Sequence, residues 1–311
     1  MKEIKRVFDF YDQTYLKSYN LDQAIRYQLS LLDSLDIYTR EHCENVATIT
    51  CNLCRKLHLS KGFTEYCTIC AYLHDIGKLF IPYNILQKPA QLTPEEYEIM
   101  KKHTTLGYKL CIKDRKLRSY HAGAYYHHEA LDGTGYPQGL VKKNIPYEAQ
   151  IIRVADEYDA LVHKRQYKSH IGITDALKII IENTKPSPNA PKHTGYSRAG
   201  KNNKKVVKNL LKVVIDDIEY EISCTIDYVK ILDKEIDRFK KIEKYIKKKN
   251  SSKKKKDIVY YEQYIDLLLQ PGESVEDFDR LYQEAKDAYQ LRKGILSDLH
   301  KEIKNVKRLH V

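Results

Sequence analysis

Apolar residues recur at every third or fourth position over much of the chain. Between Thr39 and Leu57 the pattern is carried by Val46, Ile49, Leu53 and Leu57, a spacing that places these side chains on one face of a helix. No stretch alternates apolar and polar residues as a half-buried strand does, so the predicted fold class is all-α. Similar patterns predict further helices over about 64–77, from 94 onward, and over about 118–129, 147–163 and 173–183.

The start of the helix near residue 94 carries its own signal. Thr93 is followed by Pro94, and Glu96 stands three residues after Thr93. This order is typical of a capping box, in which the threonine hydroxyl and the glutamate carboxylate satisfy free backbone N–H groups.

The pattern changes after residue 184. Residues 185–204 are rich in Pro, Asn, Gly and Lys, which predicts a flexible basic loop. Two long apolar stripes follow, from Ile218 to Ile246 and from Phe278 to Val306, separated by the polar run 251–256. They predict a helical hairpin or a coiled-coil-like C-terminal extension.

These changes divide the chain into four parts. We expect an N-terminal helical segment over 1–35, a compact helical domain over 36–184, the basic loop over 185–204 and the helical extension over 205–311. Residues 205–216 are a candidate last element of the compact domain. The extension shows no catalytic pattern, so self-association as a homodimer, or contact with another partner, is its expected role.

The composition indicates a soluble protein with a core, since 42% of the 311 residues are hydrophobic and 31% are charged. No run of 18 apolar residues could form a transmembrane segment, and the N-terminus does not resemble a signal peptide. We therefore expect a cytoplasmic protein, in which the seven cysteines stay reduced.

The net charge of +12 lies mainly in the part of the chain after residue 184. Solvated helix surfaces explain such an excess at least as well as an anionic partner does. In the basic loop only Tyr196 stands among the lysines, whereas proteins that grip single strands use several aromatic residues. No nucleic-acid polymer is therefore expected as a partner.

Histidines and aspartates form a set that metal chemistry would explain. Taken singly, each histidine is better interpreted as a surface or structural residue. Taken together, four or more imidazoles with two carboxylates can hold two divalent cations in mixed nitrogen and oxygen coordination. The candidate ligands, each on or at the end of a predicted helix, are His42, His74, Asp75, His103, His127, His128 and Asp156.

Two doublets in this set belong to longer motifs. The first is HDIGK at 74–78, and the second is HHEALDGTGYP at 127–137. With YTREH at 38–42 and ADEYDAL at 155–161, they make the region 36–184 resemble the HD-GYP family of metal-dependent phosphohydrolases. The resemblance implies an HD-domain helical bundle. A lone HD doublet would be a weak signal, but the ordered set with these separations is a strong one.

The resemblance also implies an activity. The chain would be a phosphodiesterase that hydrolyses cyclic di-GMP to linear pGpG, with GMP as an alternative end product, through a hydroxide bridging two metals. Asp75, as the bridging ligand, and Lys78, beside the scissile phosphate, are the predicted catalytic residues. Tyr136 would lie near the nucleotide, and Arg165 and Lys168 would contact the phosphates of the substrate.

The predicted cofactors are two divalent metal ions per chain, with iron or manganese expected. Some family members carry a glutamate four residues before the first histidine, and it helps to hold a third metal. Tyr38, a poor ligand, stands at that position here, so we expect two metals. Ala90 replaces the glycine that usually follows the Lys-Pro pair, which changes the expected turn but not the chemistry.

Two cysteine pairs mimic a zinc ribbon. They are Cys51 with Cys54 and Cys67 with Cys70, and the spacing within each pair suits zinc. Both pairs, however, lie inside predicted amphipathic helices, where a reduced cysteine acts as a small buried apolar residue. We interpret them as packing residues.

Two other functions remain open from the sequence. The same chemistry could act on another cyclic dinucleotide or on a nucleotide monophosphate. The chain could instead be a signalling module that binds cyclic di-GMP with little turnover, although its intact ligand set disfavours that reading.

Overall fold

The computed structural model describes residues 37–163, 171–186 and 199–311. Within these ranges all regular structure is helical, apart from one isolated antiparallel bridge between Asp132 and Val141. The predicted all-α class is therefore confirmed. The predicted N-terminal segment over 1–35 lies outside the described residues. No helix in the described ranges is long and apolar enough to cross a membrane.

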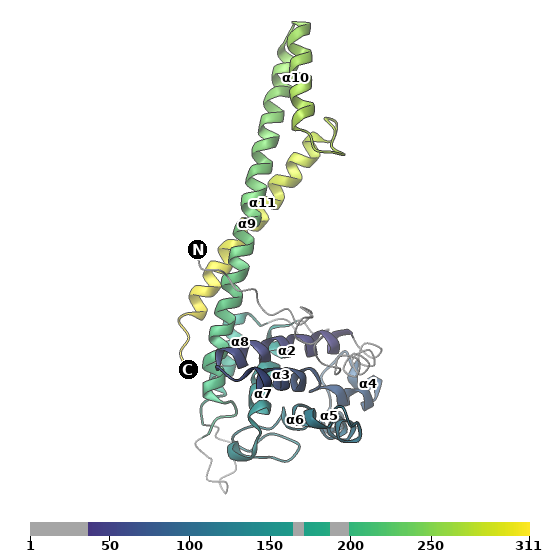
Figure 1. Ribbon diagram of the computed structural model, residues 1–311, viewed down its shortest axis with the longest axis vertical. Helices are drawn as coiled ribbons and strands as arrows, with labels where there is room; N and C mark the ends of the chain where they lie inside the picture. Colours follow the sequence, from purple (N-terminus) through teal and green to yellow (C-terminus); the bar gives the residue numbers. More distant parts are fainter. Residues whose placement is uncertain (1–36, 164–170, 187–198) are drawn as a thin grey trace. The chain divides into compact units, whose positions relative to one another are not determined.

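The described residues separate into two compact units (Figure 1). The first contains the residues up to Asp216 together with Asn305–Val311, and the second is Asp217–Lys304. The helices of the first unit, in chain order, are α2 (Ile37–Lys56), α3 (Lys61–Tyr72), the 3-10 helix η1 (Ile76–Phe80), α4 (Tyr83–Leu86), α5 (Pro94–Lys113), η2 (Arg118–Tyr120), α6 (His121–Tyr126), η3 (Lys142–Asn144), α7 (Tyr147–Val162) and α8 (Ile173–Glu182). The first part of α9 (Lys204–Ser251) also belongs to it.

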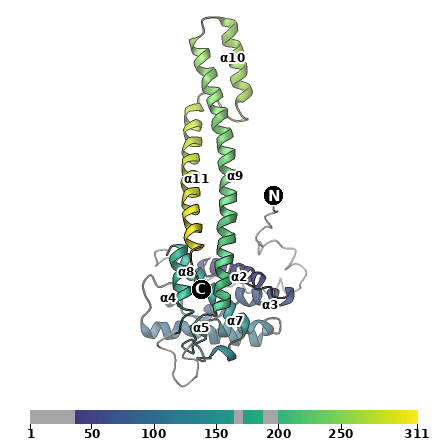
Figure 2. The same ribbon diagram turned by 90° about the vertical axis from the view of Figure 1, so that its left-hand side faces the viewer.

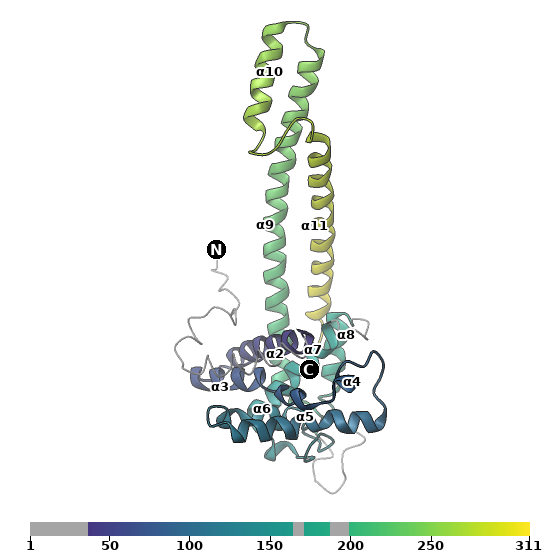
Figure 3. The ribbon, with the colours of Figure 1, turned by 90° about the vertical axis from the view of Figure 1, so that its right-hand side faces the viewer.

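Apolar helix faces build the core of this unit. Helix α2 packs against α3 and α7, while α5 packs against η1 and α6 (Figures 1 and 3). On the inner faces of α2 and α7, Val46, Leu53, Ile151 and Val154 are fully buried. Burial of such side chains contributes about 1.5–3 kcal/mol each, so the apolar periodicity that predicts these helices also fixes which faces meet.

Two predicted helices end earlier than their apolar pattern indicated. The helix predicted over 64–77 ends at Tyr72, and the chain resumes as η1 only at Ile76. The helix predicted over 118–129 is a 3-10 turn followed by α6, which ends at Tyr126. In both cases the ligand doublet, His74-Asp75 or His127-His128, lies in the turn just after the helix.

The predicted cap of α5 is present. The Glu96 backbone N–H donates to the Thr93 hydroxyl at 3.2 Å, and the Thr93 N–H donates to the Glu96 carboxylate at 2.8 Å. Pro94 occupies the first helical position. The helix that carries His103 thus begins at a position fixed by its own sequence.

The second unit contains three helical segments rather than the two predicted. Helix α9 continues without a break to Ser251, and the polar run then ends it as expected. The helix predicted from the apolar stripe between Phe278 and Val306 is present as α11 (Phe278–Val306), whereas α10 (Lys255–Leu268), which precedes it, was not predicted. Pro271 cannot donate a helical hydrogen bond, and Gly272 adopts a φ of 91°, so the helix cannot pass through them.

A small apolar core joins these three segments. Phe239 and Ile242 of α9 cluster with Ile265 of α10 and Phe278 of α11, and Figures 2 and 3 show both later helices lying beside α9. Arg238 connects the turn to α9, since its guanidinium donates to both carboxylate oxygens of Glu273 at 2.6 and 2.7 Å.

The two cysteine pairs lie in the core. Cys51, Cys54, Cys67 and Cys70 are buried free thiols. Among the described residues, neither of the two side-chain groups able to hold a metal includes a cysteine. Their placement agrees with packing rather than with a zinc ribbon.

Candidate metal centre

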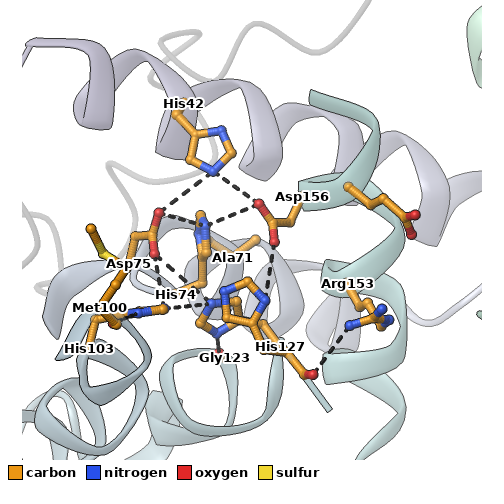
Figure 4. Close-up of polar contacts among 12 residues, drawn as sticks. His42, Ala71, His74, Asp75, Met100, His103, Gly123, His127, Arg153 and Asp156 are labelled. Atoms are coloured by element: carbon orange, nitrogen blue, oxygen red, sulfur yellow. Dashed lines mark hydrogen bonds and ion pairs between the residues drawn. The ribbon is translucent and has the colours of Figure 1, made fainter. Parts of the chain in front are cut away.

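The seven predicted ligands converge inside the first unit (Figure 4). Helix α2 provides His42, the turn after α3 provides His74 and Asp75, and α5 provides His103. The turn after α6 provides His127 and His128, and α7 provides Asp156. Two groups form within this set, each with its ligand atoms within 4.8 Å of one another: His42, His74 and Asp75, and His103, His127 and His128.

Asp75 lies between the histidines of the two groups. Its Oδ2 atom is 3.6 Å from His42 Nε2 and 3.3 Å from His74 Nε2. Its Oδ1 atom is 3.4 Å from His103 Nε2 and 4.0 Å from His127 Nε2. One carboxylate therefore presents one oxygen to each group.

Asp156 repeats this arrangement from α7. Its Oδ1 atom is 3.1 Å from His42 Nε2 and 4.0 Å from His74 Nε2, whereas Oδ2 is 3.9 Å from His128 Nδ1. In Figure 4 both carboxylates span the space between His42 and the lower imidazoles. The centre thus has two adjacent positions, each with nitrogen and oxygen donors.

Backbone carbonyls orient three of the rings. His74 Nδ1 donates to Ala71 O at 2.6 Å, and His103 Nδ1 donates to Met100 O at 2.7 Å. His127 Nδ1 donates to Gly123 O at 2.8 Å. Because Nδ1 carries the proton in these bonds, Nε2 keeps its lone pair and faces the centre.

His42 is oriented by a side chain instead. Its Nδ1 lies 2.6 Å from Asp159 Oδ2, one turn beyond Asp156 on α7. The other carboxylate oxygen of Asp159 contacts His163 Nδ1 at 2.7 Å. Burial alone would lower the pKa of His42, but Asp156 and Asp159 together raise it above the usual value.

The second histidine group is held neutral. Burial lowers the pKa of His127 well below its usual value, and that of His128 to about 3. Burial lowers the pKa of His103 as well. Neutral imidazole is the form that binds metals, so these rings need not lose a proton first at neutral pH.

Lys78 contributes a positive charge next to Asp75. Its ammonium group lies 2.5 Å from Asp75 Oδ2. Burial by itself would raise the pKa of Asp75, but Lys78 and the nearby imidazoles hold that pKa well below the usual value. Asp75 is therefore an ionised carboxylate in a buried site.

The donor set fits divalent cations. The Nε2 atoms of His42 and His74 are buried and have no hydrogen-bond partner of suitable geometry, although such atoms are rarely left unpaired. The carboxylates of Asp75, which is buried, and of Asp156, which is partly buried, face this space, and their combined charge exceeds that of Lys78. Cations bound between them would satisfy both the lone pairs and the charge.

Gly77 permits the close packing that brings the HD turn to α5. A Cβ atom at this position would lie 1.9 Å from His103 O, which real structures do not allow. The glycine after His74 and Asp75 therefore lets η1 approach the helix that carries His103.

The DGTGYP corner places an aromatic ring against the centre. Asp132 Oδ1 accepts hydrogen bonds from the Thr134 N–H at 3.0 Å and from its hydroxyl at 2.7 Å. A Cβ on Gly135 would lie 2.2 Å from Ala130 N, so the turn needs glycine there. Tyr136 then stacks on His128 with ring centroids 4.6 Å apart, next to the predicted ligands.

Some contributors were not assigned a role from the sequence. Asp159 lies in the ADEYDAL motif, and its spacing of three from Asp156 on a helix was a usable signal. Arg153 carried no such signal, yet its guanidinium donates to His128 O at 3.3 Å. The predicted phosphate contacts, Arg165 and Lys168, lie outside the described residues.

Comparison with known proteins gives a family match. The family model described as HD domain matches residues 21–186. A cyclic di-GMP phosphodiesterase of Thermotoga maritima is 35% identical over 197 residues, covering 56% of this chain and 54% of the relative. The cyclic di-GMP phosphodiesterase response regulator RpfG of Xanthomonas campestris is 40% identical over 133 residues, covering 42% of this chain and 35% of the relative.

A third relative acts on a different cyclic dinucleotide. The 3′3′-cGAMP-specific phosphodiesterase 3 of Vibrio cholerae is 36% identical over 153 residues, covering 49% of this chain and 33% of the relative. The chain thus spans between a third and about half of the length of these relatives.

Proposed function

Because this chain belongs to the HD domain family, in its HD-GYP type, we propose that it is a metal-dependent phosphodiesterase that hydrolyses cyclic di-GMP to the linear dinucleotide. One observation carries the proposal. Asp75 and Asp156 each direct one carboxylate oxygen toward the first histidine group and the other oxygen toward the second. This arrangement suits a pair of cations.

The ligands would divide between two metal positions. His42 and His74 would hold one cation, and His103, His127 and His128 would hold the other, with Asp75 shared between them. Iron or manganese suits this mixture of imidazole and carboxylate donors. Bound there, the cations would lower the pKa of a water molecule and offset the charge of the phosphate group.

Lys78 would act on the same phosphate. Its ammonium is mostly enclosed, with 15% of the side chain exposed, and charge interactions are stronger away from bulk water. A fixed positive charge beside the scissile group stabilises negative charge that develops on the phosphoryl oxygens. Asp75 holds this ammonium in place through their contact at 2.5 Å.

The nucleotide would be bound by Tyr136. Its ring lies between His128, on which it stacks, and Tyr97, whose ring centroid is 6.5 Å away. Lys101 Nζ lies 5.6 Å from the centroid of the Tyr136 ring, so a cation and an aromatic face stand together close to the metal ligands. Arg165 and Lys168 would contact the phosphates.

A direct assay tests the proposal. The full chain, purified without oxygen and loaded with Mn²⁺ or Fe²⁺, should convert cyclic di-GMP to pGpG or GMP, as followed by chromatography. Treatment with a chelator should abolish turnover and added Mn²⁺ should restore it, while Asp75→Ala should stay inactive. Tight binding of cyclic di-GMP with no turnover in metal-loaded protein would instead indicate a binding module and refute the proposal.

The Vibrio relative supports one alternative substrate, 3′3′-cGAMP. The same assay with 3′3′-cGAMP at equal concentration separates the two. Our proposal requires a higher kcat/KM for cyclic di-GMP, and a clear preference for 3′3′-cGAMP would replace it with the alternative.

A further inference from the structure

Residues Gly200–Asn203, here called the clasp, directly precede α9 and belong to the first unit. A Cβ on Gly200 would lie 2.3 Å from Thr184 C, so the clasp runs close to the end of α8. The Leu131 N–H donates to Lys201 O at 3.0 Å, which connects the clasp to the loop after the histidine doublet. The clasp falls outside the matched range 21–186.

Asn202 is a buried polar residue of the clasp, with 3% of its surface exposed. Its backbone N–H donates to Asn183 O at 2.9 Å. Its side-chain Oδ1 accepts from Arg153 Nε at 3.0 Å, and its Nδ2 donates to Glu157 Oε2 at 2.5 Å. The Asn202 amide thus lies between the Arg153 guanidinium and the Glu157 carboxylate, which are one turn apart on α7.

Arg153 extends this contact to the metal centre. Its Nη1 donates to His128 O at 3.3 Å, as the dashed line from the guanidinium in Figure 4 shows. The same carbonyl oxygen accepts the Tyr136 N–H at 3.2 Å. A continuous set of hydrogen bonds therefore runs from Asn202 through Arg153 and His128 O to Tyr136.

We propose that Arg153 and Asn202 are positioning residues for His128 and Tyr136. Asn202 holds the Arg153 guanidinium, and Arg153 holds the carbonyl of His128 and with it the backbone between the His128 ring and the DGTGYP corner. This inference rests on the proposed function, because it gives His128 and Tyr136 their roles. It also makes Asn202, beyond the matched range, part of what completes the site.

The charges on α7 explain why Asn202 matters. Glu157 stands four residues after Arg153, a spacing at which opposite charges pair on a helix. Asn202 and Asn183 donate their amides to Glu157 instead. Without the Asn202 amide, Arg153 would pair with Glu157, and its guanidinium would leave His128 O.

The test compares Asn202→Ala and Arg153→Lys with a neighbouring control in the full chain. Asn203 also bonds to α7, through Gln150 Oε1 at 2.8 Å, but that contact does not lead to His128. Asn203→Asp keeps the oxygen that caps α9, which accepts from Lys205 N at 2.9 Å. It therefore disturbs the clasp without disturbing Arg153.

We expect hydrogen exchange at the Tyr136 amide in metal-free protein to become about tenfold faster in Asn202→Ala and Arg153→Lys. Their Mn²⁺ affinity and kcat should each fall about tenfold or more, with the control close to wild type in all three. Should Asn202→Ala fail to fold, Arg153→Lys alone decides. Wild-type exchange and Mn²⁺ affinity in Arg153→Lys would overturn the inference.

The outcomes for the two proposals are separable. Hydrogen exchange and Mn²⁺ binding need no substrate, so they report on positioning even if the wild type fails to hydrolyse cyclic di-GMP. Absent turnover with a changed exchange rate refutes the proposed function alone. Unchanged exchange with normal wild-type turnover refutes the positioning role alone.

Discussion

Asp159 and His42 form a close pair behind the metal centre, with 2.6 Å between Asp159 Oδ2 and His42 Nδ1. This contact fixes the ring so that its Nε2 faces Asp75 and Asp156. Carboxylates that hold the far nitrogen of a metal-binding histidine also raise its strength as a ligand. Asp159 should therefore tune the metal position that includes His42.

Asp159→Asn removes the charge but keeps the shape of this contact. We expect Mn²⁺ affinity at one position to fall about 10–100-fold, measured by isothermal titration calorimetry. Asp175→Asn is the matched control, since Asp175 pairs with Lys178 on the exposed side of α8. Equal affinities for the two variants would contradict the prediction.

Lys78→Met tests the role of the ammonium group next to Asp75. If Lys78 stabilises charge on the phosphoryl oxygens, kcat should fall about 10²–10³-fold while KM changes little. Lys88→Met serves as the control, because Lys88 also pairs with a carboxylate, that of Glu96 at 2.5 Å, but on the α5 cap. A kcat for Lys78→Met within about twofold of that control would show that Lys78 is structural.

The number of bound metal ions tests whether Asp75 is shared between two metal positions. We expect two tightly bound Mn²⁺ per chain, since Tyr38 stands where some family members carry the glutamate that helps to hold a third metal. His42→Ala should retain about one tight equivalent, because His42 belongs to one group only. Asp75→Ala should weaken both, because its oxygens face both. Three equivalents in the wild type, measured by mass spectrometry of metals, would refute the two-metal prediction.

Much of the centre could be predicted because its side chains come from short local motifs. His74 and Asp75 are adjacent, as are His127 and His128, and the helices that precede these doublets follow from apolar periodicity. The Thr93 cap could likewise be predicted, since it depends only on neighbours in the sequence.

Contacts between distant residues could not be predicted in this way. Arg153 and Asn202 are 49 residues apart, and nothing in either local sequence indicates their hydrogen bond. The need for glycine at 77 depends on the carbonyl of His103, on another helix.

Buried thiols should be unreactive. Burial raises the pKa of Cys43, Cys51 and Cys67, and raises that of Cys111 to about 12. Because the thiolate is the reactive form, raising the pH from 7 to 9 should not speed their alkylation. Cys224 is exposed, so a thiol reagent should modify about one of the seven cysteines in folded protein and all seven after denaturation. Rapid modification of a CxxC pair would contradict the packing interpretation.

Arg238 should stabilise the turn between α10 and α11. Its side chain is 14% exposed and donates to Glu273 and to Leu268 O at 2.8 Å. Arg238→Ala should lower local stability by about 1–3 kcal/mol, seen as faster hydrogen exchange over 268–278. Arg280→Ala removes two exposed ion pairs, with Asp277 and Glu284, and should have no such effect. Self-association through this unit stays a prediction, to be measured by light scattering.

The main-chain acceptors behind His74, His103 and His127 have an evolutionary consequence. Ala71, Met100 and Gly123 contribute carbonyl oxygens, which every amino acid possesses. Substitution of Met100, which is partly exposed, therefore leaves the acceptor of His103 in place, whereas Ala71 is fully buried and a Cβ on Gly123 would lie 2.1 Å from Cys70 O. The ring of His42 responds instead to a single exchange at Asp159. Divergent members of such a lineage would be expected to adjust their metal preference at His42 first.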